Sequence, residues 1–179
     1  MIALSFGSLI LLSAVKIYPQ FRQQVSILYQ HYRLEQIMRQ GIFTIEKDLR
    51  RAGFCKKKCY GSAITLSQYR GEIENSCIII AYDLNRNGYW EEEGHENSEY
   101  FGYRLHNGSL EAQRGGKTCF GNGWEKLFDP QEIQITHFTI TDLNDLTPGN
   151  LFKLQLSGHS VRNPRIQLQI NSVINGKNL

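Results

Sequence analysis

Apolar residues are concentrated at the start of the chain, where residues 1–15 (MIALSFGSLILLSAV) include no charged side chain. As a helix this run is about 23 Å long at 1.5 Å per residue, short of the roughly 30 Å hydrocarbon core of a bilayer. A cleaved signal peptide needs basic residues before the run and a small-residue site after it, and neither is present. We therefore expect residues 1–19 to be the later part of a membrane anchor helix whose beginning is missing. A hydrophobic core helix is the alternative.

Residues 20–53 continue this run with the period of an amphipathic helix. Two arginines followed by Gly53 form a typical C-terminal stop signal. Pro19 removes a backbone donor and clashes with the preceding turn, so we expect a kink near Val15. The apolar positions of the main stripe are spaced by three, four or seven residues; they are Ile27, Leu34, Met38, Ile42, Ile45, Leu49 and Ala52.

A second stripe on the same helix, here called the outer stripe, consists of Phe21, Val25, Leu28 and Tyr32. Two stripes on one helix favour burial from more than one side, as when several such helices pack together. The alternative is that these side chains widen a single core face. On the first interpretation the outer stripe is a subunit-packing surface.

After Gly53 the pattern changes to the two-residue alternation of β-strands. Asn107 and Gly108 lie between two such runs and form a two-residue hairpin signal. A long helix followed by strands predicts an α+β fold, in which the helix packs on the antiparallel β-sheet of a head domain, residues 54–179. Strands are expected at residues 62–66, 77–83, 100–105, 109–113, 133–141, 151–157 and 166–174, and an ordered loop at residues 115–130.

Composition and charge exclude several classes of protein. Hydrophobic residues make up 41% of the 179 residues and charged residues 21%, which is typical of a globular domain and not of a disordered chain. The net charge of +3 does not favour a nucleic-acid partner. The sequence has no G-x-S-x-G, H-E-x-x-H, P-loop or G-x-G-x-x-G motif, and its histidines are scattered. We therefore expect a protein that is not an enzyme and requires no cofactor.

Four cysteines, Cys55, Cys59, Cys77 and Cys119, allow three disulfide pairings. Zinc sites usually use two close cysteine pairs, and only the first two residues are close here. If the head is exported, an oxidising compartment favours disulfides over zinc or free thiols. The favoured pairing is Cys55 with Cys59 and Cys77 with Cys119. A bridge from the helix-end cysteines into the sheet is the alternative.

The strongest chemical motif is the acidic segment DLNRNGYWEEE at residues 83–93. In a calcium loop, oxygen ligands occupy positions 1, 3 and 5, glycine position 6, a backbone carbonyl position 7 and often a carboxylate position 9. Position 12 here is Gly94 rather than a bidentate Glu, and the flanks resemble strands. The alternative is therefore a plain hairpin turn with a solvated acidic face. The candidate Ca²⁺ ligands are Asp83, Asn85, Asn87, Tyr89 through its carbonyl, and Glu91.

Three consecutive basic residues, Lys56, Lys57 and Lys58, lie between two cysteines. They form a candidate ligand loop for phosphate or a lipid headgroup, and a solvated loop is the alternative.

Several segments together support a family resemblance that covers nearly the whole chain. They are MIALSFGSLILLSA, RAGFCKKKC, NSC, DLNRNGYWE, FGYRL, LEAQRGGKTC and GNGWEK. This combination resembles the type IV pilin superfamily, more narrowly its minor J-type or PilW-like pseudopilins, and within them the prepilin peptidase-dependent protein B family. The resemblance implies a single-pass inner-membrane anchor and a periplasmic head. It also implies a role in initiating or capping a type IV pilus or a type II secretion pseudopilus, with other minor pilins and the inner-membrane assembly platform as partners.

Members of this superfamily begin with a basic leader and a G-F-x-L-x-E motif, where a prepilin peptidase cleaves and methylates the new N-terminal Phe. This sequence starts after that motif. Prepilin peptidase is therefore expected as a partner only if the motif precedes Met1. An alternative function is a pilus-tip adhesion or DNA-uptake module that uses Lys56, Lys57 and Lys58.

Overall fold

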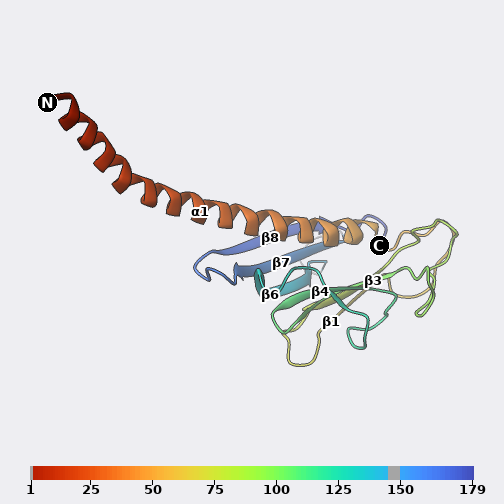
Figure 1. The fold of residues 1–179 in the computed structure, drawn as a ribbon. Helices are drawn as coiled ribbons and strands as arrows, with labels where there is room; N and C mark the ends of the chain where they lie inside the picture. The colour runs from red at the N-terminus through yellow and green to blue at the C-terminus, as the bar shows by residue number, and fades with distance from the viewer. Residues whose placement is uncertain (1, 145–149) are drawn as a thin grey trace.

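The computed structural model describes residues 2–144 and 150–179; the side chains of residues 2–14, most of the predicted anchor, lie outside the description. One helix, α1, spans Ile2–Arg51. Figure 1 shows its C-terminal half lying over a β-rich head, while its N-terminal half projects away from the head. The predicted α+β architecture, with a long N-terminal helix on antiparallel β-structure, is confirmed.

The described part of the head contains two antiparallel sheets. One has the strand order β1-β2-β3-β4-β5 and the other the order β6-β7-β8. All seven predicted strands are present with slightly shifted ends, but they divide between the two sheets. The strands are β1 (Ile64–Ser67), β2 (Cys77–Ala81), β3 (Tyr100–His106), β4 (Ser109–Arg114), β5 (Glu125–Lys126), β6 (Ile133–Asp142), β7 (Leu151–Ser160) and β8 (Gln167–Asn175).

Both the end of α1 and its bending follow from the sequence. Gly53 adopts a φ of +80°, and its amide donates a 2.9 Å hydrogen bond to the carbonyl oxygen of Ala81. Pro19 lies inside the helix without ending it, and Figure 1 shows gradual bending of the projecting half. The bend expected near Val15 is therefore present as gradual curvature of a continuous helix. The loss of one backbone hydrogen bond is accommodated as curvature.

The main stripe of α1 contacts the head only from Leu34 onward. The residues from Leu34 to Ala52 in this stripe are buried in the core cluster. Ile27 has the same helical phase but is 50% exposed. The predicted buried stripe therefore begins too early, because helical period identifies a face but not the point at which the opposing surface stops.

β2 is buried on both faces and separates two clusters in the head. Ile78 and Ile80 belong to the cluster that includes the α1 stripe. Cys77 and Ile79 point to the opposite face and join a second cluster, which Trp90 and Trp124 partly cover. Because alternate residues of a strand face opposite sides of a sheet, one strand contributes to both clusters.

The connections around β4 show what local sequence can and cannot predict. Asn107 and Gly108 join β3 to β4 with φ angles of 48° and 70°, as a tight hairpin turn requires. β5 falls inside the segment expected to be a loop. It contains only two residues, which pair with Glu111 and Ala112 of β4, and so it is too short to produce an alternating pattern.

Within residues 2–144 and 150–179, no helix combines the length and the apolar content needed to cross a membrane.

Candidate functional site

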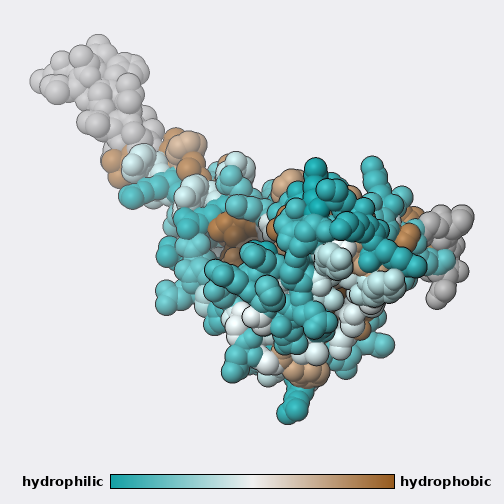
Figure 2. All heavy atoms as spheres, turned by 90° about the vertical axis from the view of Figure 1, so that its right-hand side faces the viewer, coloured by the Kyte–Doolittle hydropathy of each residue, from teal (hydrophilic) through white to brown (hydrophobic). Residues whose placement is uncertain are grey.

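The outer stripe lies on the projecting part of α1, away from the head. Its four side chains, Phe21, Val25, Leu28 and Tyr32, are between 47% and 70% exposed. The alternative that they widen the core face is therefore wrong. Figure 2 shows brown apolar residues along this part of the helix, whereas most of the visible head surface is hydrophilic. Such exposure of adjacent large apolar side chains is typical of an interaction surface.

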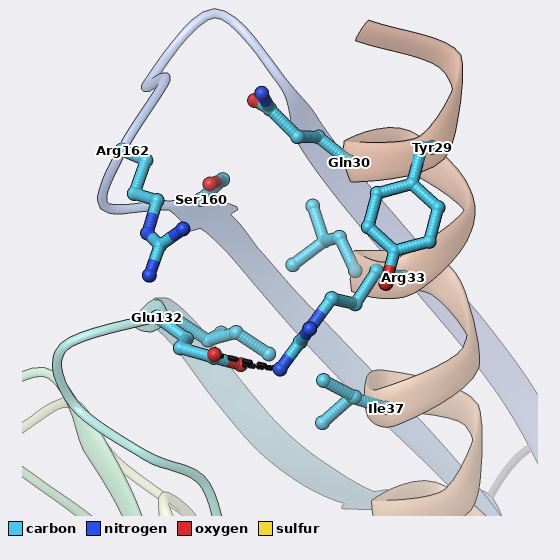
Figure 3. Close-up of a pocket in the computed structure, with 9 residues that line it drawn as sticks. Tyr29, Gln30, Arg33, Ile37, Glu132, Ser160 and Arg162 are labelled. Carbon is cyan, nitrogen blue, oxygen red and sulfur yellow. Dashed lines mark hydrogen bonds and ion pairs between the residues drawn. The ribbon is translucent and has the colours of Figure 1, made fainter. Parts of the chain in front are cut away.

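A small pocket of about 70 Å³ lies where α1 leaves the head. In Figure 3, Glu132 points from the loop before β6 toward Arg33 on the helix. Nη2 of Arg33 donates to Oε1 and Oε2 of Glu132 at 2.7 and 2.9 Å. Hydrogen bonding to Tyr29 and to Glu132 raises the pKa of Arg33. The pocket is far smaller than the roughly 300–1,000 Å³ of small-molecule sites, so it is a helix–head junction rather than a ligand site.

The predicted calcium loop connects β2 to β3 and is organised by the buried residue Asp83. Its Oδ1 accepts the backbone N–H of Asn87 at 3.1 Å. Its Oδ2 accepts the backbone N–H groups of Gly88 and Lys56 at 2.9 and 3.0 Å. Both oxygens are thus used by backbone donors, and Asp83 shapes the turn rather than presenting a free carboxylate.

The structure brings Asn85, Asn87 and Glu91 together in this loop. Nδ2 of Asn85 donates to Oε1 of Glu91 at 3.1 Å, and Nδ2 of Asn87 makes a shorter hydrogen bond to the same atom. The Oδ1 atoms of Asn85 and Asn87 accept the backbone N–H groups of Asn87 and Tyr89, each at 2.9 Å. The two amides therefore act as donors to Glu91 in this arrangement.

Glu99, which lies outside the predicted ligand set, enters the same loop from its far end. It is only 1% exposed, and its Oε1 accepts the backbone N–H groups of Leu84 and Asn85 at 2.6 and 3.0 Å. Burial and the neighbouring Glu91 raise the pKa of Glu99 to about 7. Although burial acts in the opposite direction, hydrogen bonding to Asn85, Glu99 and Asn87 holds the pKa of Glu91 below its ordinary value. The only sequence signal for Glu99 is its place in an acidic segment just before β3.

Among the residues that the structure describes, no three His, Cys, Asp or Glu side chains converge as a ready-made metal site. All four cysteines form disulfides, Cys55 with Cys59 and Cys77 with Cys119, which matches the favoured pairing. A zinc site built from these thiols is therefore excluded.

The candidate ligand loop of lysines lies against the acidic loop. The ammonium group of Lys57 is 5.5 Å from the ring centroid of Tyr89, and that of Lys58 is 5.6 Å from the ring centroid of Tyr60. The backbone N–H of Lys56 donates to Asp83. The three lysines are exposed, but Lys56 and Lys57 are built into the acidic loop instead of forming a separate basic surface.

Comparison with known proteins gives one family and two relatives. Residues 27–176 match the family described as prepilin peptidase-dependent protein B. The chain is 28% identical over 181 residues to the prepilin peptidase-dependent protein B of Escherichia coli strain K12, covering 100% of this chain and 93% of that protein. It is 28% identical over 191 residues to an uncharacterized protein of Haemophilus influenzae, covering 80% of this chain and 79% of that protein. No solved structure matches the chain.

Proposed function

The chain belongs to the prepilin peptidase-dependent protein B family, and from this membership we propose that it is a minor pilin or pseudopilin with a structural role. It initiates or caps the assembly of a type IV pilus or of a type II secretion pseudopilus. Its location is the cell envelope, with the head in the periplasm and α1 directed toward the inner membrane. Its partners are other minor pilins or pseudopilins and the assembly platform.

The observation that carries this proposal is the division of α1 into a packed part and an exposed part. The helix has 50 residues, and its main stripe is buried only from Leu34 onward. The outer stripe lies before that point and has no partner surface on the described head. Fully burying one such side chain contributes about 1.5–3 kcal/mol, so burying four half-exposed ones against a neighbouring helix contributes on the order of 5 kcal/mol.

The junction between helix and head supports the same role. Arg33 and Glu132 hold α1 at the point where it leaves the head. This ion pair is half exposed, and such pairs contribute only about 0–1 kcal/mol, so its effect is on direction more than on stability. A helix held in one direction presents the outer stripe to neighbouring subunits in a defined orientation.

The alternative of a tip adhesion or DNA-uptake module is less well supported. It requires the lysines to form an accessible basic surface. Lys57 instead packs its stem on Gly88 and its ammonium group near Tyr89, both in the acidic loop, whose negative charge opposes binding of an anionic ligand.

Assembly assays in a strain that lacks the endogenous copy test the proposal. A Phe21→Ser/Leu28→Ser variant should accumulate normally, because both side chains are exposed, but should fail to restore filaments or pseudopilus-dependent secretion. The matched control is Val173→Ser, which changes an exposed valine on β8 of the head. Normal assembly by the double variant would reject the outer stripe as a packing surface. Normal filaments with lost DNA binding in a Lys57→Gln/Lys58→Gln variant would favour the alternative.

A further inference from the structure

Two carboxylate oxygens in the loop between β2 and β3 are buried and receive no hydrogen bond from an N–H or hydroxyl group; the two carboxyl groups contact only each other through them. These oxygens are Oε2 of Glu91 and Oε2 of Glu99. Leaving a buried polar atom without a partner is costly, and more so when it carries charge. Glu99 is the stronger case, because it is 1% exposed while one of its oxygens has only the carboxylate of Glu91 as a neighbour to bond with. This pair of atoms therefore indicates that a positively charged species belongs in the loop.

The backbone holds these two residues next to each other. The N–H of Glu99 donates to the carbonyl oxygen of Glu91 at 3.3 Å, and Oγ of Ser98 donates to the same carbonyl at 3.2 Å. Asn85 also donates a hydrogen bond to the Oε1 atom of each carboxylate. Its side-chain amide donates to Glu91 and its backbone N–H donates to Glu99. With each Oε1 held in this way, the Oε2 atoms of the two carboxyl groups are the ones left to interact with each other, and they are the oxygens available to a bound cation.

We propose that this loop binds one Ca²⁺ ion, with Glu91 and Glu99 as carboxylate ligands and Asn85 and Asn87 as amide ligands. Rotation of each amide by half a turn would present Oδ1, in place of Nδ2, to the ion, in exchange for the hydrogen bond that each Oδ1 accepts from a backbone N–H in the structure. The backbone carbonyl of Tyr89 and water complete the six to eight oxygen ligands that Ca²⁺ takes. A continuous calcium loop has a carboxylate at position 12. Here Glu99, at the far end of the loop, takes the place of that carboxylate.

The donor set favours calcium over other common divalent ions. It contains only oxygens, and the one histidine between β2 and β3, His95, is not among the proposed ligands, so zinc is disfavoured. Mg²⁺ requires near-ideal octahedral geometry and gives up its water reluctantly, whereas Ca²⁺ accepts an irregular set of carboxylates, amides and carbonyls. The charge of two carboxylates balances that of one divalent ion.

Asp83 is a positioning residue in this site, because backbone donors already occupy both of its oxygens.

The loop between β2 and β3 also contacts the residues that follow the end of α1. The N–H of Asp83 and Nε1 of Trp90 both donate to the carbonyl oxygen of Phe54, at 2.8 and 3.1 Å. A bound ion would therefore stiffen the junction between α1 and the five-stranded sheet, independently of any role in filament assembly.

Calcium titration of the full chain after removal of metal by a chelator tests the proposal. Isothermal titration calorimetry should show one Ca²⁺ per chain, with Mg²⁺ at least tenfold weaker. Tb³⁺ in the same site should show emission sensitised by Trp90. Glu91→Gln and Glu99→Gln should each weaken Ca²⁺ binding at least tenfold. Glu93→Gln, which changes an exposed carboxylate of the same acidic segment, should leave the affinity unchanged.

Asn87→Ala provides a second test that does not alter a buried carboxylate, and it should also weaken binding at least tenfold. Near-UV circular dichroism identifies any variant that does not fold. Absence of Ca²⁺ binding by the wild-type chain at millimolar concentrations would overturn the proposal and indicate that Glu91 and Glu99 share a proton instead. Unchanged affinity in the folded Glu91 or Asn87 variants would also overturn it.

Discussion

The hydroxyl group of Tyr103 donates a 2.6 Å hydrogen bond to Oδ2 of Asp48, which joins the middle of β3 to the last turns of α1. Tyr82 donates to the other oxygen, Oδ1, at 3.0 Å. Asp48 is only 3% exposed and lies among the apolar residues of the helix–sheet interface. Because two phenols satisfy the buried carboxylate, it connects helix and sheet at a specific register instead of opposing their contact.

We predict that Tyr103→Phe lowers the free energy of unfolding by about 1.5–3 kcal/mol, because it removes a donor from a buried charged acceptor and changes little else. Urea unfolding followed by circular dichroism measures the change. Tyr60→Phe is the matched control, since Tyr60 is exposed on the head surface. Equal stability of the two variants would show that the Asp48 contact is not stabilising.

A loss of stability at alkaline pH should originate from the same tyrosines. Burial and the Asp48 carboxylate raise the pKa of Tyr82 to about 12 and raise the pKa of Tyr103 further. Unfolded tyrosine titrates near pH 10, so the folded state holds these protons more tightly. The two protonated tyrosines therefore contribute their full share of the free energy of unfolding below about pH 10. This contribution is lost as the pH rises toward and through about 12.

Unfolding free energies measured across this range should therefore fall more steeply for the wild-type chain than for a Tyr82→Phe/Tyr103→Phe variant. Parallel curves for the two proteins would assign the alkaline loss to other groups.

The two disulfides should contribute unequally to stability. The cysteines of the Cys77–Cys119 bridge are 42 residues apart in sequence, and those of the Cys55–Cys59 bridge are 4 residues apart. On the chain-entropy model these loops correspond to about 4 and about 2 kcal/mol. Paired Cys→Ala variants of each bridge, compared by thermal unfolding, should show the larger loss for Cys77 and Cys119. The reverse order would show that loop entropy does not control their contribution.

Gly41→Ala should destabilise the protein although alanine is the better helix former. The substitution gains about 1 kcal/mol in helix propensity. A Cβ at this position would overlap the ring of Phe128, which is buried in the helix–head interface, and overpacking of this kind costs about 1–3 kcal/mol. Urea unfolding should show a lower free energy of unfolding for Gly41→Ala than for the wild-type chain. In a Phe128→Leu background, the Gly41→Ala substitution should no longer lower it. A stabilised single variant would contradict it.

The features that the sequence alone determined are those in which neighbouring residues carry the whole signal. The stop at Gly53, the hairpin at Asn107 and Gly108, and the main stripe each follow from backbone conformation or side-chain period within one segment. The acidic motif likewise identified three side chains that meet, Asn85, Asn87 and Glu91, because they belong to one short loop.

The tertiary structure decided what depends on surfaces distant in sequence. It placed Glu99 beside Glu91 through the pairing of backbone segments, and it buried Asp48 against tyrosines from β3 and the end of β2. It also set the point before Leu34 at which α1 leaves the head. Periodicity within a helix specifies which face is apolar, but only the extent of the opposing sheet determines how much of that face is covered.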